Sequence, residues 1–503
     1  MPSTRRRNLL AIARGRSPSH FTQQVTSSPG WTDRTYAGGG NHYYVSSSLG
    51  DDSNDGLSES TPFQTLFRGY SAIANNSRDR LSLRRGDAWA GESLGQNTGQ
   101  IGKWEKSGVG PAMADRISVD SYGDLNLPRP LIDSHSEYGI WVGMQSGGNL
   151  AFFDLDFVNR RREFNGTLYD ATADAIGGVR VTAGVHDVLF EGIRTMFHGT
   201  GFSCDFDSFT GNYPERVTFK RCVAAYNYPI GSHGQGWFSN GAHYLTLDEC
   251  ILVQNGWNPA RQVAKTVFNH SAYLHHQKNL LVDKCWNIDG SNMAWKLKSN
   301  VAANRTTLEG SYDGTVNNCI CSLCGIGISY GGNIEAVDIG FLNQVSDGNI
   351  YIDMIGGPPP NLVRRGYGIK SIDGFSGTNN LFVQSDAISG NWPAVWVLDL
   401  FPNGVLNGNI DQSLIHQWDS GSQPLVRIDP VTGFTETNSI KDRLDSEFVD
   451  PTLTLGSYAA ARGLSPTTEA LMAALAEQRY GNWREDLETP DCQAYLRAGF
   501  TLV

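Results

Sequence analysis

Lys296 and Lys298 stand two residues apart in a short segment that reads Trp-Lys-Leu-Lys-Ser from 295 to 299. In a β-strand successive side chains point to opposite faces, so both lysines would lie on one face and Trp295 and Leu297 on the other. The pair is unexpected in a chain with 40 Lys and Arg against 51 Asp and Glu. We interpret it as a binding site for a uronate or sulfate group; a solvated strand face is the alternative.

A polar column is expected around these lysines. The positions eleven residues after a repeated motif, described below, are Cys204, His233, Arg261, Lys296 and Tyr330. If successive coils stay in register, these positions form one column. Eliminative cleavage of a uronate polymer needs a cation beside the carboxylate and a base near the acidic carbon. The candidate cations are Lys296, Lys298 and Arg261, and the candidate bases or proton donors are His233, His270 and Tyr330.

A pair of carboxylates offers different chemistry. On one strand, Asp205 and Asp207 would share a face, with their Cα atoms about 6.5–7 Å apart. Glycoside hydrolysis uses two carboxylates, and carboxylate oxygens also bind Ca²⁺. The pair is therefore the candidate metal site, and Ca²⁺ is the one candidate cofactor; a turn cluster is the alternative.

Tryptophans are candidate platforms for sugar rings. We assign Trp237 and Trp257 to substrate binding, together with Lys298 and His270. Packing between coils is the alternative for the tryptophans. The sequence contains no nucleophile elbow, phosphate-binding loop or dinucleotide fingerprint.

An internal repeat carries these residues. One template, apolar–any–apolar–polar–polar–Cys, ends at Cys222, Cys250 and Cys285, with a degenerate copy at Cys319. Related units end at Leu155 and Ile193, and the whole series recurs every ~28–38 residues. The period of two within each unit predicts strands. Asn227, Asn255 and Gly290 follow at one fixed offset and predict corners.

Short strands, frequent corners and a variable step predict an all-β parallel β-helix, a solenoid of stacked coils. Equivalent residues of such a fold stack about 4.8 Å apart. The four motif cysteines are therefore expected to form an inward ladder of small buried hydrophobes rather than disulfides or a metal site. The 57 glycines among 503 residues fit the many corners.

The ends of the chain differ from the repeat. Residues 1–41 form a basic arm whose apolar stretch is too short for a secretory signal. We interpret the arm as an anchor that docks onto an acidic partner; a disordered basic tail is the alternative. The β-helix is expected over 42–440, with an N-terminal helical cap at about 68–74. A small C-terminal helical segment is expected over 441–503, with helices opening at Ser465-Pro466 and Thr489-Pro490, as a cap or docking segment.

Several segments resemble proteins of one superfamily. They are 43–58 with 61–66 and Leu83-Arg-Arg-Gly-Asp87, then 269–274 and 326–331, and finally 475–500. The first set is similar to the entry segment of right-handed parallel β-helix proteins of the pectate-lyase-like superfamily. The last resembles a C-terminal segment of some bacterial and phage proteins of this fold. The resemblance implies contact with a polysaccharide, acidic in several members, and Ca²⁺ in some lyases.

These observations leave three functions open. The first is a phage-like virion spike that binds, and in an active form cleaves, an acidic host polysaccharide; the resemblance implies a homotrimer joined to other virion proteins through its N-terminal arm. The second is a free extracellular polysaccharide lyase that acts on an acidic glycan, and the third is a non-catalytic structural or glycan-binding β-helix. A net charge of −11 argues against nucleic acid as a partner. No apolar run reaches the ~18 residues of a membrane-spanning helix.

Overall fold

The computed structural model describes most of the chain beyond residue 29. The described residues are 30–35, 38–97, 99, 101–135, 138–143, 147–206, 211–231, 233–299, 310–331, 341–355, 364–370, 372–384, 392–397, 407–416, 418, 422–429, 433–439, 450 and 452–500. The chain divides into two compact units, Met1–Tyr36 and Ala37–Val503.

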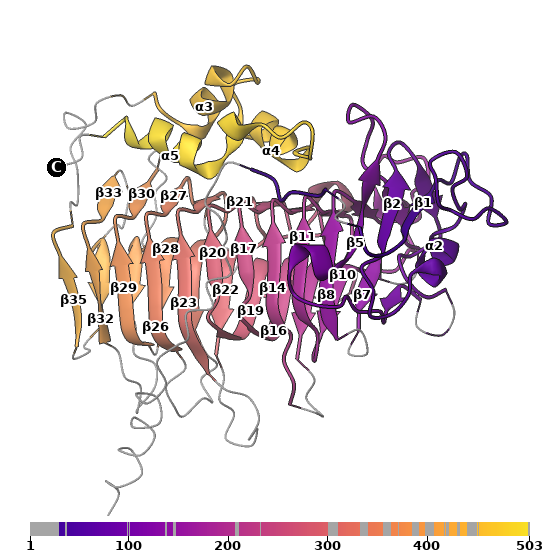
Figure 1. Ribbon diagram of the computed structural model, residues 1–503. Coiled ribbons are helices and arrows are strands. Elements are labelled where there is room, and N and C mark those ends of the chain that lie inside the picture. The colour runs from indigo at the N-terminus through magenta and orange to yellow at the C-terminus, as the bar shows by residue number, and fades with distance from the viewer. Residues whose placement is uncertain are drawn as a thin grey trace, which may run out of the picture. The chain divides into compact units, whose positions relative to one another are not determined.

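The second unit is a parallel β-helix built from three ladders of parallel strands (Figure 1). The first ladder contains β1 (His42–Val45), β2 (Arg80–Arg84), β5 (Ile117–Tyr122), β8 (Gly148–Phe153), β11 (His186–Glu191), β14 (Glu215–Lys220), β17 (Thr246–Asp248), β20 (Leu281–Asp283), β23 (Ser311–Asn317), β26 (Phe341–Asp347), β29 (Ile372–Thr378), β32 (Asn407–Asp411) and β35 (Phe434–Thr437).

Each coil continues through one strand of the second ladder and one of the third. The second ladder contains β3 (Ala88–Ala90), β6 (Leu131–Asp133), β9 (Asp156–Val158), β12 (Arg194–Met196), β15 (Val223–Ala225), β18 (Ile251–Val253), β21 (Trp286–Ile288), β24 (Ile320–Ser322), β27 (Ile350–Ile352), β30 (Leu381–Val383) and β33 (Leu414–His416). The third contains β4 (Lys103–Trp104), β7 (Ile140–Val142), β10 (Gly177–Thr182), β13 (Thr200–Asp205), β16 (Gln235–His243), β19 (His270–Lys278), β22 (Met293–Lys298), β25 (Ile326–Gly331), β28 (Arg365–Ile369), β31 (Val395–Val397) and β34 (Val426–Ile428).

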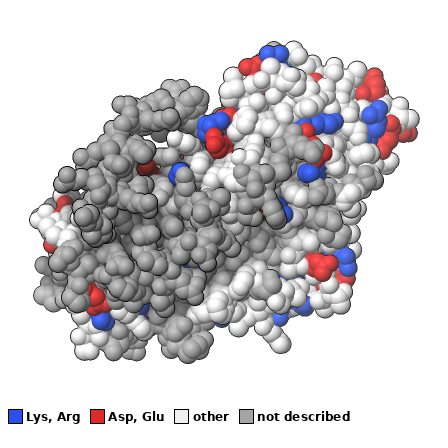
Figure 2. Space-filling model, turned by 90° about the horizontal axis from the view of Figure 1, so that it is seen from below, with Lys and Arg blue, Asp and Glu red and all other residues white. Residues whose placement is uncertain are grey.

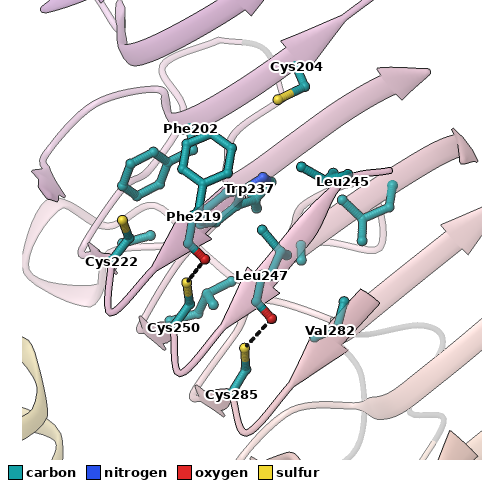
Figure 3. Packing of buried hydrophobic residues seen from close by; sticks show 14 of the residues in the cluster. Phe202, Cys204, Phe219, Cys222, Trp237, Leu245, Leu247, Cys250, Val282 and Cys285 are labelled. Carbon is teal, nitrogen blue, oxygen red and sulfur yellow. Dashed lines mark hydrogen bonds between the residues drawn. The ribbon is translucent and has the colours of Figure 1, made fainter. Parts of the chain in front are cut away.

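The core lies inside the coils, where like residues stack on like. Phe219, Leu247, Val282 and Val316 occupy one position of the first ladder. The predicted cysteine ladder is confirmed: Cys222, Cys250, Cys285 and Cys319 are free thiols with no exposed surface. Their thiols donate to backbone oxygens, as Cys250 does to Phe219 and Cys285 to Leu247 (Figure 3).

The corners are made by two repeated devices. Between the first and second ladders, the residue before each cysteine adopts a left-handed conformation, with φ between 49° and 54° at Arg221, Glu249 and Lys284. After the second ladder, the predicted corner residues Asn227 and Asn255 are buried, and Nδ2 of Asn227 donates to Oδ1 of Asn255 at 3.0 Å. These asparagines satisfy backbone groups that a corner would otherwise leave unpaired.

Helix α2 (Leu66–Ala72) begins after Thr65, whose hydroxyl accepts from the N–H of Arg68, and packs against β1. Helices α3 (Leu455–Ala461), α4 (Thr468–Ala476) and α5 (Thr489–Arg497) pack on the outer face of the second ladder (Figure 1). Short 3₁₀ turns occur at η1 (Met113–Asp115), η3 (Arg160–Arg162), η4 (Pro259–Arg261) and η6 (Glu485–Leu487). Within the described part of the chain, no helix has both the length and the apolar character needed to cross a membrane.

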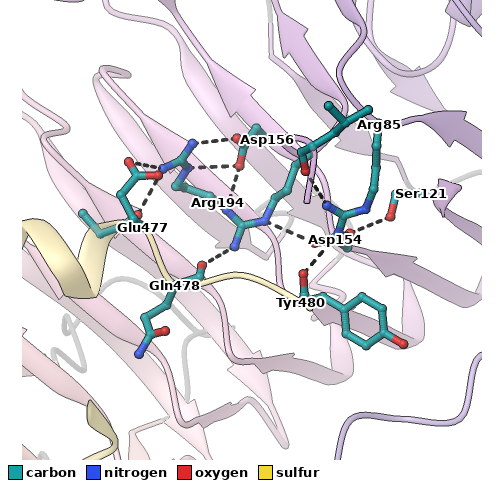
Figure 4. Close-up of polar contacts among 11 residues, drawn as sticks. Arg85, Ser121, Asp154, Asp156, Arg194, Glu477, Gln478 and Tyr480 are labelled. Atoms are coloured by element: carbon teal, nitrogen blue, oxygen red, sulfur yellow. Dashed lines mark hydrogen bonds and ion pairs between the residues drawn. The ribbon is translucent and has the colours of Figure 1, made fainter. Parts of the chain in front are cut away.

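A buried ion network ties residues 476–480 to the coils (Figure 4). The carboxylate of Asp156 on β9 forms two ion pairs: its Oδ2 lies 2.7 Å from a guanidinium nitrogen of Arg194, and its Oδ1 lies 3.1 Å from one of Arg129. Arg194 also pairs with Glu477 at 2.7 Å. Further bonds run to backbone oxygens of the same segment, from Arg129 to Gln478 and from Arg85 to Tyr480. The C-terminal helices are thus held by charge as well as by apolar packing.

Candidate functional site

Two polar columns run along the outer face of the third ladder. The first outer column contains Arg180, Ser203, Phe238, Tyr273, Lys296, Ser329, Gly368 and Trp396. The second outer column contains Thr182, Asp205, Asn240, His275, Lys298 and Gly331. Neighbouring residues of a column lie about 4.8 Å apart, so each column is a line of closely spaced side chains.

Three lysines gather where these columns cross β22, β25 and β28. Lys296 and Lys298 are on β22, and Lys370 directly follows β28; we call these three the lysine cluster. Gly331 lies between them: a β-carbon built there would be 3.6 Å from Nζ of Lys296 and 3.7 Å from Cδ of Lys370. No carboxylate of a described residue forms an ion pair with any of the three.

The lysine cluster is electrostatically strained. Burial, followed by the charges of Lys370 and Lys298, lowers the pKa of Lys296 to about 7. Burial lowers the pKa of Lys298 as well. For Lys370 burial acts first and Arg365 second, and both lower its pKa. An anionic ligand placed among these side chains would relieve this repulsion and restore their charge.

Aromatic and imidazole rings border the lysine cluster. Tyr273 and His275 lie edge to face with ring centroids 4.0 Å apart, and the ammonium of Lys298 lies 6.0 Å from the Tyr273 ring. Nε2 of His275 has no hydrogen-bond partner among the described residues. Burial, followed by the charge of Lys298, holds the pKa of His275 well below its usual range, so this ring is neutral near pH 7.

Charges elsewhere on the molecule are mixed. On the face drawn in Figure 2, described Lys and Arg side chains lie in small groups beside Asp and Glu (Figure 2). Typical pairs are Lys265 with Asp289 at 2.8 Å and Arg216 with Asp187 at 2.9 Å. The lysine cluster differs because its charges have no such partners among the residues that the structure describes.

The predicted placement of the two lysines is confirmed. Lys296 and Lys298 are half-buried on the outer face of β22, while Trp295 and Leu297 are buried in the core. Their role in ligand binding stays a prediction.

The predictions that Tyr330 and Trp237 belong to the site are wrong, because both side chains point into the core. Tyr330 pairs in register with Leu297 and has no exposed surface. Trp237 is equally buried and stacks on Phe202 with ring centroids 4.4 Å apart. Neither side chain is available to a ligand on the outer face.

The predicted column is also wrong at His233, Arg261 and Lys296, the last of which lies in the outer column instead. The column that contains Cys204 continues through Ser239, Leu274, Leu297 and Tyr330, and all of it faces inward. His233 is exposed ahead of β16, with its ring 5.6 Å from that of Phe268. Arg261 ends η4, and its guanidinium lies 4.2 Å from the Tyr169 ring.

The remaining predicted residues have mixed placements. His270 begins β19 on the side of the lysine cluster and is 4% exposed. Burial, followed by the charge of Lys296, holds the pKa of His270 well below its usual range. Trp257 donates to the backbone oxygen of Asp289 at 2.7 Å, and the ammonium of Lys265 lies 4.5 Å from its ring.

The predicted carboxylate pair is only partly described. Asp205 faces outward on β13, and its Oδ2 accepts from Nε of Arg180 at 3.0 Å. Asp207 lies outside the described residues. No group of three or more His, Cys, Asp or Glu among the described residues is arranged to hold a metal ion. The metal role of the pair stays a prediction.

Sequence reasoning missed Lys370, Ser329, Tyr273 and Arg365. A virtual β-carbon at Gly368 would lie 3.7 Å from a terminal nitrogen of Arg365 and 3.9 Å from Oγ of Ser329, so these side chains also face the outer columns. The alternation inside each strand was a usable signal. A fixed count of residues does not identify equivalent positions in successive coils, because the segments between strands differ in length.

Comparison with known proteins finds only distant likenesses. No protein-family model matches the chain, and no curated protein does. Among solved structures, a rhamnogalacturonan lyase is similar at 15% identity and a TM-score of 0.48, over 82% of this chain and 91% of that one. The pectate lyase Pel9A is similar at 16% identity and 0.47, over 84% and 85%. The Dettilon tailspike protein is similar at 11% identity and 0.45, over 73% and 62%.

Proposed function

We propose that the outer face of the third ladder binds an acidic polysaccharide, with an anionic group held among Lys296, Lys298 and Lys370. The observation that carries this proposal is the absence of any ion pair between these lysines and a described carboxylate. Placing cations together away from water raises the free energy of the fold unless a counter-charge arrives. Sites of this kind mark function more often than stability.

An extended polymer suits this face better than a small anion does. The outer columns run past many coils at a spacing of about 4.8 Å, so several sugar units can lie along them. Rings stand on both sides of the lysine cluster: Phe238 and Tyr273 precede it, and Trp396 follows it. The guanidinium of Arg365 lies 3.9 Å from the Trp396 ring and extends the positive surface.

Cleavage by elimination is the reaction that this arrangement favours. Lys296 has a pKa of about 7, so much of it is neutral near pH 7 and accepts a proton. In the proposed step, Nζ of Lys296 takes the proton from the carbon beside the uronate carboxylate. The electron pair forms the new double bond to the neighbouring carbon, the bond from that carbon to the glycosidic oxygen breaks, and the leaving oxygen takes a proton from solvent. Lys298 and Lys370 stabilise the charge that develops on the carboxylate.

The binding claim is tested by calorimetry with acidic and neutral polysaccharides. Lys298→Ala should weaken binding of an acidic polymer by about tenfold or more, because each charged hydrogen bond contributes ~1.5–3 kcal/mol. Lys284→Ala is the matched control: it removes the same charge at the corner between the first two ladders, where Lys284 pairs with Asp283. Equal effects of the two substitutions would contradict the site.

We further propose that the protein is a spike of a virus-like particle, with the basic arm as its anchor. Five arginines among the first sixteen residues, Arg5, Arg6, Arg7, Arg14 and Arg16, support an attachment segment that docks onto an acidic partner. A spike of this kind is expected to be a homotrimer. Mass photometry should then give about three times 55.0 kDa, and a strictly monomeric particle would count against the spike and leave the free lyase.

A further inference from the structure

A cavity opens on the same outer face as the lysine cluster, nearer the N-terminal coils. Its volume is about 290 Å³. The lining residues that matter here are Tyr138, Thr200, Ser203, Asp205 and Phe238. They come from β13, β16 and the residues just before β7, so the cavity lies across neighbouring coils and is continuous with the two outer columns.

One carboxylate, that of Asp205, lines the cavity, and Arg180 beside the cavity balances its charge. Asp205 accepts from Nε of Arg180 at 3.0 Å, and the two side chains remain 18% and 28% exposed. Arg180 also donates to the hydroxyl of Tyr138 at 3.3 Å, and its guanidinium lies 5.0 Å from the Trp141 ring. Oδ1 of Asp205 makes no hydrogen bond with another described residue. The cavity therefore has no excess charge of either sign, unlike the lysine cluster.

The polar groups of the cavity match a neutral sugar. The carboxylate oxygen of Asp205 accepts from sugar hydroxyls, and the hydroxyls of Thr200 and Ser203 both donate and accept. Tyr138 and Phe238 add aromatic surface for the apolar face of a ring. A uronate here would bring its carboxylate against Asp205, which disfavours it.

We propose that this cavity binds a neutral sugar of the same polysaccharide whose acidic group is held by the lysine cluster. This inference rests on the proposed function of that cluster. Asp205, Asn240, His275 and Lys298 follow one another in register, so the cavity and the cluster are three coils apart, or roughly 14 Å. The ligand is then a heteropolysaccharide in which neutral and acidic sugars alternate or recur at that spacing, not a polyuronate.

The test compares two oligosaccharides of equal length by calorimetry with the full chain. One is hyaluronan octasaccharide, in which uronate and N-acetylhexosamine alternate; the other is an octamer of galacturonate. The unsubstituted protein should prefer the alternating oligomer. Asp205→Asn should weaken binding of that oligomer by about tenfold and strengthen binding of the polyuronate, because Arg180 then has no counter-charge. Equal changes for both oligomers would overturn the proposal.

A second variant guards against misfolding at Asp205. Thr200→Phe fills the cavity without changing its charge, so it should weaken only the alternating oligomer. Binding of methyl N-acetylglucosaminide, followed by saturation-transfer NMR, should be lost in the same variant and kept in Lys298→Ala. This readout does not depend on the lysines. A monosaccharide signal that persists in Thr200→Phe overturns the cavity, whereas unchanged acidic binding in Lys298→Ala overturns the proposed function instead.

Discussion

Lys296 combines two properties that exclude each other at any one moment. As an ammonium it attracts an anionic ligand, and as a neutral amine it accepts a proton. A pKa of about 7 makes both forms common near neutral pH. The cause is local: burial acts first, and the charges of Lys370 and Lys298 add to it.

The pH dependence of cleavage follows from this pKa. The reactive form is the neutral amine, so kcat/KM should rise as pH rises through about 7 and level off above it. Affinity for the acidic ligand should fall over the same interval, because Lys296 loses its charge there. Steady-state rates from the ultraviolet absorbance of the unsaturated product, with binding measured separately, check both trends.

Lys296→Arg separates the two roles. Arginine keeps the positive charge but stays protonated, so binding should survive while kcat falls by about 10²–10⁴-fold. Lys298→Arg is the matched control and should keep both binding and cleavage. If Lys296→Arg cleaves at the original rate, another group is the base.

Gly331→Val tests the lysine cluster without altering charge. The glycine leaves open space beside Lys296 and Lys370, and valine fills it. Binding of an acidic polymer should weaken by about tenfold. Ser376→Val, on the exposed outer face of the first ladder, is the control and should bind normally. Unchanged affinity in Gly331→Val would place the ligand elsewhere.

At the scale of elements, the sequence predicted strands, corners and the inward cysteines because each depends on local spacing. The sequence did not predict which residues of the third ladder share a column, because the segments that lead from the second ladder to the third differ in length from coil to coil. Cys204 and Tyr330 lie eleven residues after Ile193 and Cys319 and do share a column. Between β18 and β19 the chain inserts η4, so the count from Cys250 reaches Arg261 rather than Leu274.

The corner asparagines should matter to stability. Oδ1 of Asn255 accepts from Asn227, and its Nδ2 donates to the backbone oxygen of Ala224 at 2.8 Å. Asn255→Ala removes these bonds and also the one from the backbone N–H of Asn227, and each buried group left without its partner costs about 1–3 kcal/mol. Thermal unfolding should therefore begin at a lower temperature. The exposed Asn126→Ala, by contrast, should leave the transition almost where it was.

At the scale of the whole unit, the C-terminal helices depend on a buried charge network. Burial alone would raise the pKa of Asp156, but Arg194 and Arg129 outweigh it and hold the pKa below its ordinary value. A carboxylate with a depressed pKa stabilises the fold above its unfolded pKa of about 3.9, and that contribution is lost as pH falls further.

Arg129→Met removes one partner of this network. Breaking a buried pair costs about 3–5 kcal/mol, so residues 476–480 should detach more easily. Acid unfolding followed by tryptophan fluorescence should show a midpoint at higher pH than in the unsubstituted protein. Arg216→Met breaks a half-exposed pair with Asp187 and should move the midpoint much less.

The same network can form only late in synthesis, because it joins residues that are far apart in the sequence. The hydrogen bond from Arg85 to the backbone oxygen of Tyr480 cannot form until Tyr480 is made, 395 residues later. At about 5–20 residues per second, ribosomes need ~20–80 s for that interval. Until residues 455–497 are made, the apolar outer face of the second ladder lacks the helices that cover it in the folded protein. A nascent chain stalled before residue 476 therefore displays a hydrophobic strip that chaperones and proteases recognise.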